Sequence, residues 1–90
     1  MGIVGSIQYI DYFGNLITNI SGNEVAGQAW WVIAGDRKIS GSLTYSSAPP
    51  GEMIALIGSH GWVEIAVNGG SAESVLQLGV GTIIEVVLSL

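Results

Sequence analysis

Apolar residues occur along this chain in short blocks, and residues that favour turns separate one block from the next. The blocks lack the period of an amphipathic helix and are typical of strands. We place the strands at Ile3–Ile10, Leu16–Ile20, Trp30–Ala34, Ile39–Tyr45, Met53–Ile57, Trp62–Val67 and Ile83–Leu88. Seven short strands in 90 residues predict an all-β fold, a small antiparallel β-barrel that forms one domain over residues 1–90.

The connections between these strands carry the residues of tight turns. Ala34 to Arg37 is expected to close one hairpin and Gly58 to Gly61 another, because glycine accepts positive φ without strain. One short helix is predicted from Ser71 to Leu76, with its first residue as the N-terminal cap and Gly79 at its end. A further turn of helix is expected near Gly22 to Gly27.

Composition and charge limit the classes of partner. Hydrophobic residues make up 49% of the chain, enough for a single core. Only Arg37 and Lys38 are basic, and the net charge of −5 argues against nucleic acids and anionic membranes, which are bound through clustered cations. The lack of cysteine excludes disulfides and thiolate sites. With no signal peptide or long apolar segment in the sequence, we expect a cytoplasmic protein.

The apolar content also bears on assembly. The strand Ile83–Leu88 carries one charge, Glu85, so we expect cover on both of its faces. Trp30, Trp31 and Trp62 add a large aromatic surface for so small a chain. Self-association into a homo-oligomer, or cover by another domain, is therefore expected.

Groups that could carry catalysis are scarce. The one histidine, His60, lies in a Ser-His-Gly turn, where an exposed structural residue is more typical than a base or a metal ligand. The seven carboxylates are spread singly along the chain rather than paired as acid and base. A metal site would need more histidines or closer carboxylates. We predict no catalytic residues and no metal site in this chain.

Groups that could bind a ligand are better placed. The run Asp11–Ile20, DYFGNLITNI, puts a ring, a glycine and a side-chain amide on one turn, and two further turns hold Ser59 with His60 and Asn68 with two glycines. An amide can donate to and accept from a purine edge, and the backbone at glycine allows close approach. Three such turns at one rim could enclose a nucleoside. The alternative is ordinary turn chemistry, in which asparagine serves only because it tolerates left-handed geometry.

Three ordered motifs make this chain similar to a known family. They are IDYFGNLITNI at residues 10–20, TYSSAPPGE at 44–52 and IGSHGWVEIAVNGGSA at 57–72. From about Gly5 to Val86 the chain closely resembles the C-terminal domain of the S-adenosyl-L-methionine (SAM) hydroxide adenosyltransferases. These enzymes hydrolyse SAM to adenosine and methionine, and they are related to the SAM-dependent fluorinase and chlorinase.

The resemblance implies a division of labour between two domains. A larger N-terminal α/β domain holds the ribose and carries the Asp, Arg and His residues that activate water, and it is absent from this chain. The C-terminal β-barrel holds adenine and part of the methionine tail. The site lies between the N-terminal domain of one subunit and the C-terminal domain of the next in a trimer.

Five positions of this sequence would contact adenine by the same resemblance. Phe13 and Asn15 would line the adenine pocket, with Asn15 forming a hydrogen bond to the base. Tyr45 stands where the family has an aromatic ring against the base. Val67 and Gly69 would contact adenine largely through their backbone.

Ser59 and His60 occupy the turn that the family uses for the amino-acid end of SAM. Halogenating relatives tend to have arginine at the positions of His60 and Val67, so the resemblance favours hydrolysis over halogenation in a full-length parent. The expected role is a domain that binds SAM or adenosine, needs no other cofactor and is inactive alone. The alternative is an interaction or oligomerisation module that keeps the fold without ligand binding. Whether the chain is an excised domain or a separate barrel stays open.

Overall fold

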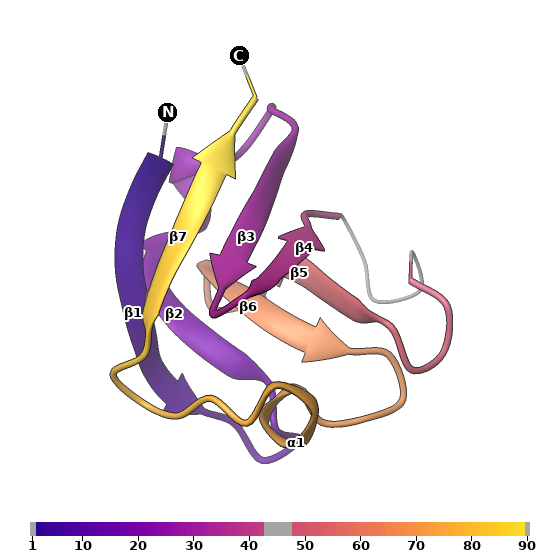
Figure 1. The fold of residues 1–90 in the computed structure, drawn as a ribbon. Coiled ribbons are helices and arrows are strands. Elements are labelled where there is room, and N and C mark those ends of the chain that lie inside the picture. The colour runs from indigo at the N-terminus through magenta and orange to yellow at the C-terminus, as the bar shows by residue number, and fades with distance from the viewer. Residues whose placement is uncertain (1, 43–47, 90) are drawn as a thin grey trace.

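The computed structural model describes residues 2–42 and 48–89, and its strands wrap around one core (Figure 1). Two short helical elements, η1 and α1, interrupt the strands. The bounds are β1 Gly2–Ile10, β2 Leu16–Ser21, η1 Gly22–Glu24, β3 Trp30–Ala34, β4 Arg37–Ser40, β5 Met53–Ile57, β6 Trp62–Val67, α1 Ala72–Leu76 and β7 Ile83–Leu88. The prediction of an all-β fold is confirmed over the described residues.

The sheet curves round until its two outer strands meet. Its order is β4-β3-β7-β1-β2-β6-β5, and every neighbouring pair is antiparallel. At the end of β4 the Gly41 N–H still donates to Trp30 O at 2.9 Å, but the Ser42 N–H donates to Ala55 O of β5 at 2.8 Å. The exchange of partners at this point nearly closes the barrel and covers part of both edges.

Gly41 also explains where the predicted strand Ile39–Tyr45 differs from the structure. β4 begins earlier, at Arg37, because Arg37 already pairs with Ala34 across the two-residue hairpin. It ends at Ser40, because the next residue, Gly41, turns toward β5. A Cβ at Gly41 would overlap the ring of Trp30, so this position requires glycine. Residues 43–47, which include Tyr45, lie outside the described residues.

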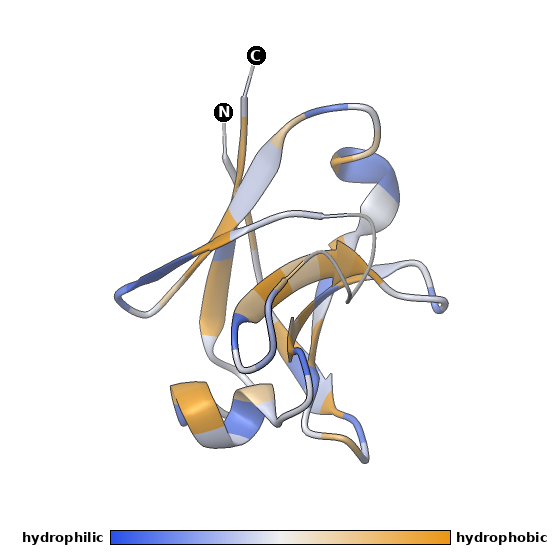
Figure 2. Cartoon of the chain, turned by 90° about the vertical axis from the view of Figure 1, so that its right-hand side faces the viewer, coloured by the Kyte–Doolittle hydropathy of each residue, from blue (hydrophilic) through white to orange (hydrophobic). Residues whose placement is uncertain are grey.

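Alternation along the strands places the core inside the barrel. The inward side chains that are fully buried include Ile7, Leu16, Val32, Ile65, Ile84 and Val86. A second, smaller cluster of Ile54, Leu56 and Ala66 lies on the other face of the β5–β6 hairpin, so β6 is buried on both faces. In Figure 2 the apolar colour follows the strands, while polar colour gathers at the turns. The β5–β6 hairpin is therefore a firm support for the turns at its ends.

The two helical elements agree with the sequence except at one end. Ser71 caps α1 as predicted, and its hydroxyl accepts from the Ser74 N–H at 3.2 Å. The helix ends at Leu76, as predicted, but the left-handed residue that terminates it is Gln77, with φ 56°, rather than Gly79, and the Gln77 N–H closes the last turn on Glu73 O. η1 gives the predicted helical turn after β2. No helix among the described residues is long and apolar enough to cross a membrane.

Candidate functional site

Asp11 organises the turn between β1 and β2. Its Oδ1 accepts hydrogen bonds from the backbone N–H groups of Phe13 and Asn15, both at 2.9 Å, and its Oδ2 accepts from Asn15 Nδ2 at 2.9 Å. The Gly14 N–H donates to Asp11 O at 3.0 Å. One carboxylate thus fixes the turn backbone and the side-chain amide of Asn15, which is only 7% exposed.

Helix α1 holds the same turn from the other side. Gly14 has φ +84°, and a Cβ there would overlap the side chain of Ser71. The Glu73 N–H, in the first turn of α1, donates to Gly14 O at 2.9 Å. Glycine is therefore required at position 14 both for its backbone conformation and for the close approach of the helix.

This turn and the segment after β6 enclose a pocket of about 530 Å³. Its lining residues are Phe13, Asn15, Val67, Asn68, Gly69 and Gly70. Asn68 is held in place, because its Nδ2 donates to Ala48 O at 2.7 Å and its backbone N–H donates to Glu52 O at 3.1 Å. Four of the residues predicted to bind adenine are therefore brought together in one hollow.

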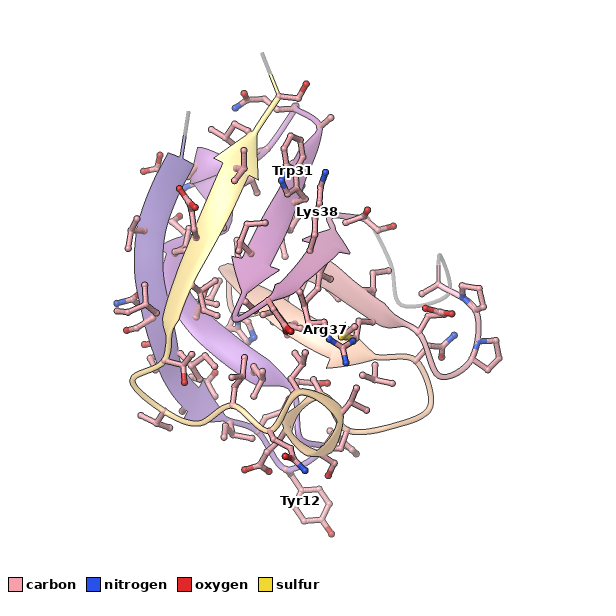
Figure 3. The ribbon with its side chains drawn as sticks, viewed as in Figure 1. Tyr12, Trp31, Arg37 and Lys38 are labelled. Atoms are coloured by element: carbon pink, nitrogen blue, oxygen red, sulfur yellow. The ribbon has the colours of Figure 1, made fainter. Side chains whose placement is uncertain are left out.

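The open side of the pocket carries an aromatic ring. Phe13 is 72% exposed although it lines the pocket, and the ring of Tyr12 meets it edge to face at a centroid distance of 5.5 Å. Tyr12 points away from the barrel into solvent (Figure 3). The turn thus offers one ring face for stacking beside a buried amide, and none of the described residues that line this pocket carries a charged side chain.

Ser59 and His60 lie elsewhere, in the turn between β5 and β6. The structure places this turn at the N-terminal end of β6, whereas the pocket is at its C-terminal end. We expected three turns at one rim, and the structure does not bring Ser59 and His60 to the rim where this pocket lies. The physical reason is the antiparallel hairpin, in which the connections before and after one strand fall at opposite ends.

His60 uses both of its ring nitrogens within the chain. Its Nδ1 accepts from the Trp62 N–H at 3.1 Å, so in the neutral ring Nε2 carries the proton and faces Glu64 Oε1 at 3.1 Å. Glu64 is buried, with only 3% exposed, and the edge of the Tyr9 ring lies near the imidazole. These contacts give His60 a part in fixing the turn.

The described residues offer no metal site. Across residues 2–42 and 48–89, no group of three or more histidine, aspartate or glutamate side chains is arranged to hold a metal ion. From the sequence we gave Asp11 no role and Ser71 only that of a helix cap, although the structure shows that both hold the binding turn. The aspartate four residues before Asn15 was the signal, because such a residue can accept from the backbone N–H groups that follow it.

Comparison with known proteins agrees with this architecture. The model of the SAM hydroxide adenosyltransferase C-terminal domain matches residues 5–85. The chain is 38% identical over 80 residues to the (R)-S-adenosyl-L-methionine hydrolase of Thermus thermophilus, a match that covers 89% of this chain. A conserved hypothetical protein from Thermus thermophilus superimposes with a TM-score of 0.86 at 34% identity, covering 96% of this chain. An uncharacterized conserved protein from Thermotoga maritima gives 0.79 at 29% identity and 94% coverage.

These relatives are much longer than the chain. It spans 30% of the length of the Thermus thermophilus hydrolase and 35% of each of the two solved structures. The match concerns one domain of a larger protein in each case.

Proposed function

Because the chain belongs to the SAM hydroxide adenosyltransferase family, as its C-terminal domain, we propose that the pocket beside Phe13 binds the adenine ring of SAM or of adenosine. One observation carries the proposal. Phe13, Asn15, Val67 and Gly69, which the family resemblance assigns to adenine, line a single pocket of about 530 Å³.

The chemistry of the pocket suits a neutral, planar base. Phe13 offers a ring for stacking, and the amide of Asn15 has the donor and acceptor groups that a purine edge needs. Gly69 has φ +76° and no neighbouring atom near its Cβ position, so a ligand can approach its backbone closely. The described lining residues are all uncharged, which favours adenine over a phosphate or carboxylate group.

The methionine part of SAM would extend from this pocket toward Ser59 and His60. β6 separates the two regions, and a six-residue strand is about 20 Å long, so only an extended ligand comes near both. Because Glu64 and the Trp62 N–H occupy the ring nitrogens of His60, we assign contact with the amino-acid end of SAM to Ser59 and the turn backbone.

Catalysis would require groups beyond this chain. His60 is the only histidine, and its nitrogens bond to the protein rather than face the pocket. We propose that the chain binds the nucleoside without cleaving SAM, and that hydrolysis belongs to the longer proteins of the family. Purified chain incubated with SAM should release no adenosine above the spontaneous background, as measured by liquid chromatography.

Two neighbouring rings provide a matched test of the pocket. Titration of the chain with adenosine, followed by amide chemical shifts in NMR spectra, should give saturable binding with a Kd on the order of millimolar, since one domain supplies only part of the site. Phe13→Ala should weaken binding about tenfold, by loss of roughly 1–2 kcal/mol of stacking. Tyr12→Ala, the adjacent exposed ring outside the pocket lining, should leave Kd within twofold.

Equal losses in the two variants, or shifts that avoid residues 13–15 and 67–70, would contradict the assigned pocket. A chain that hydrolyses SAM while it binds adenosine as described would overturn the non-catalytic part alone. The two parts of the proposal are therefore tested separately.

A further inference from the structure

The outer surface of β4, β3, β7 and β1 is a second region of interest, because it combines exposed apolar side chains with two opposite charges. Val32, Ala34, Ile84 and Val86 point into the core, so alternation turns their neighbours outward. The outward side chains form what we term the outer face: Val4, Trp31, Ile33, Lys38, Ile83, Glu85 and Val87. Val4 and Ile83 are 67% and 65% exposed, which leaves an apolar surface open to solvent.

Register places the two charges of this face on either side of one apolar residue. Ile33 of β3 pairs with Lys38 of β4 on one side and with Glu85 of β7 on the other. Neighbouring strands are about 4.8 Å apart, so the backbones of Lys38 and Glu85 are nearly equidistant from that of Ile33. The Lys38 ammonium lies 4.6 Å from the centroid of the Trp31 ring, and Figure 3 shows the two side chains next to each other.

A row of this kind is complementary to itself. If a copy is placed face to face by a half turn about an axis that runs parallel to β3 beside Ile33, its Glu85 faces Lys38 and its Lys38 faces Glu85. The two Ile33 side chains then meet at the axis. An isologous interface requires this arrangement, in which each contact occurs twice.

We propose that the outer face binds a second copy of this chain in a two-fold dimer centred on Ile33. The proposal is independent of the adenine pocket, which lies at the start of β2 and the end of β6 and shares no lining residue with the outer face. It also identifies the residues for the self-association that the sequence led us to expect.

Charge favours this face over the remaining surface. The chain carries −5 overall, so most contacts between two copies would bring like charges together. Lys38 and Glu85 cancel on the outer face, and the other basic residue, Arg37, reaches toward Met53 instead. The copies can therefore meet where their repulsion is smallest and where each charge finds an opposite partner.

The size of the face predicts a weak interaction. Four strands at about 4.8 Å spacing and about 20 Å in length give roughly 300 Å² per copy. Small interfaces of this kind belong to transient complexes, and we expect a dimer Kd in the range of about 0.1–1 mM.

Charge exchange gives a direct test. Sedimentation velocity from about 20 µM to 1 mM should show a rising mass for the wild type, and Lys38→Glu and Glu85→Lys should each raise the dimer Kd at least fivefold. The double variant K38E/E85K, which restores opposite pairs across the axis, should return Kd to within twofold of wild type. Glu24→Lys is the control, because it changes the net charge as Glu85→Lys does but lies in η1, outside the outer face.

Circular dichroism establishes that each variant keeps the fold. A wild-type chain that stays monomeric to 1 mM would overturn the proposal. So would single charge variants that dimerise like the wild type, or a double variant no better than the singles. Concentration-dependent NMR shifts confined to β5 and β6 would place self-association on another surface and would likewise contradict it.

Discussion

The carboxylate of Asp11 holds Asn15 at two points, accepting from its backbone N–H and from its side-chain Nδ2, each at 2.9 Å. Asn15 is the buried amide of the candidate pocket, so its orientation depends on a residue that does not line the pocket. The relationship makes Asp11 a positioning residue and leads to the first prediction.

Asp11→Ala should destabilise the chain by about 1–3 kcal/mol, because three N–H donors lose a charged acceptor. It should also weaken adenosine binding, since the turn and the amide are no longer fixed. Urea unfolding and NMR titration measure the two effects. Asp36→Ala is the control, since the 98% exposed side chain of Asp36 only approaches Arg37 at 3.9 Å, and the change in stability should stay within about 0.5 kcal/mol. Equal unfolding midpoints for both variants would contradict the role of Asp11.

Gly14→Ala should cost more stability than Gly27→Ala. Both glycines have positive φ, +84° and +80°, so both substitutions carry a conformational penalty of about 1–2 kcal/mol. Only at Gly14 would the new Cβ overlap Ser71, which adds about 1–3 kcal/mol of overpacking. Thermal unfolding compares the two variants directly. A similar loss in each would show that α1 does not press on the binding turn as described.

His60→Ala should lower stability by about 1–3 kcal/mol and leave adenosine binding unchanged. Removal of the ring leaves the buried Glu64 carboxylate without this partner, and it removes the acceptor of the Trp62 N–H. The adenine pocket is at the opposite end of β6, so Kd for adenosine should stay within twofold. Nitrogen NMR should find the Nε2-protonated tautomer in the neutral ring of the wild type. A neutral ring protonated on Nδ1 would contradict the hydrogen bond from Trp62.

Ser59→Ala should weaken the binding of SAM and leave the binding of adenosine unchanged. If the turn before β6 meets the amino-acid end of SAM, loss of the hydroxyl should weaken SAM binding several-fold, because one hydrogen bond contributes about 0.5–1.5 kcal/mol. Adenosine lacks that end and should bind as before. Parallel titrations with the two ligands test the difference. Unchanged SAM binding would remove Ser59 from the proposed site without affecting the adenine pocket.

The sequence predicted most strands because apolar blocks and turn residues are local signals. The predicted end of β4 was wrong, because the chain at Gly41 and Ser42 turns from β3 to pair with Ala55 of β5. Ala55 becomes a neighbour only when the barrel closes. The sequence predicted the last residue of α1, Leu76, correctly, but it assigned the termination to Gly79, because Gln77 occupies a conformation in which glycine is the usual residue.

The candidate site was predictable in its residues but not in its arrangement. The motif around Phe13 and Asn15 and the glycines after β6 were visible in the chain. Their proximity depends on the placement of β2 beside β6, which is a long-range pairing with no local signal. The support from Ser71 could not be predicted for the same reason, because α1 is far from Gly14 in sequence.

Intermolecular nuclear Overhauser effects between adenosine and the chain locate the bound adenine ring directly. We predict contacts from the adenine H2 and H8 protons to the ring of Phe13 and the methyl groups of Val67. The competing location is the hollow of about 450 Å³ beside Trp30, Trp31 and Lys38, which also offers aromatic rings. Contacts from adenine to those tryptophan rings, with none to Phe13, would contradict the proposed adenine site.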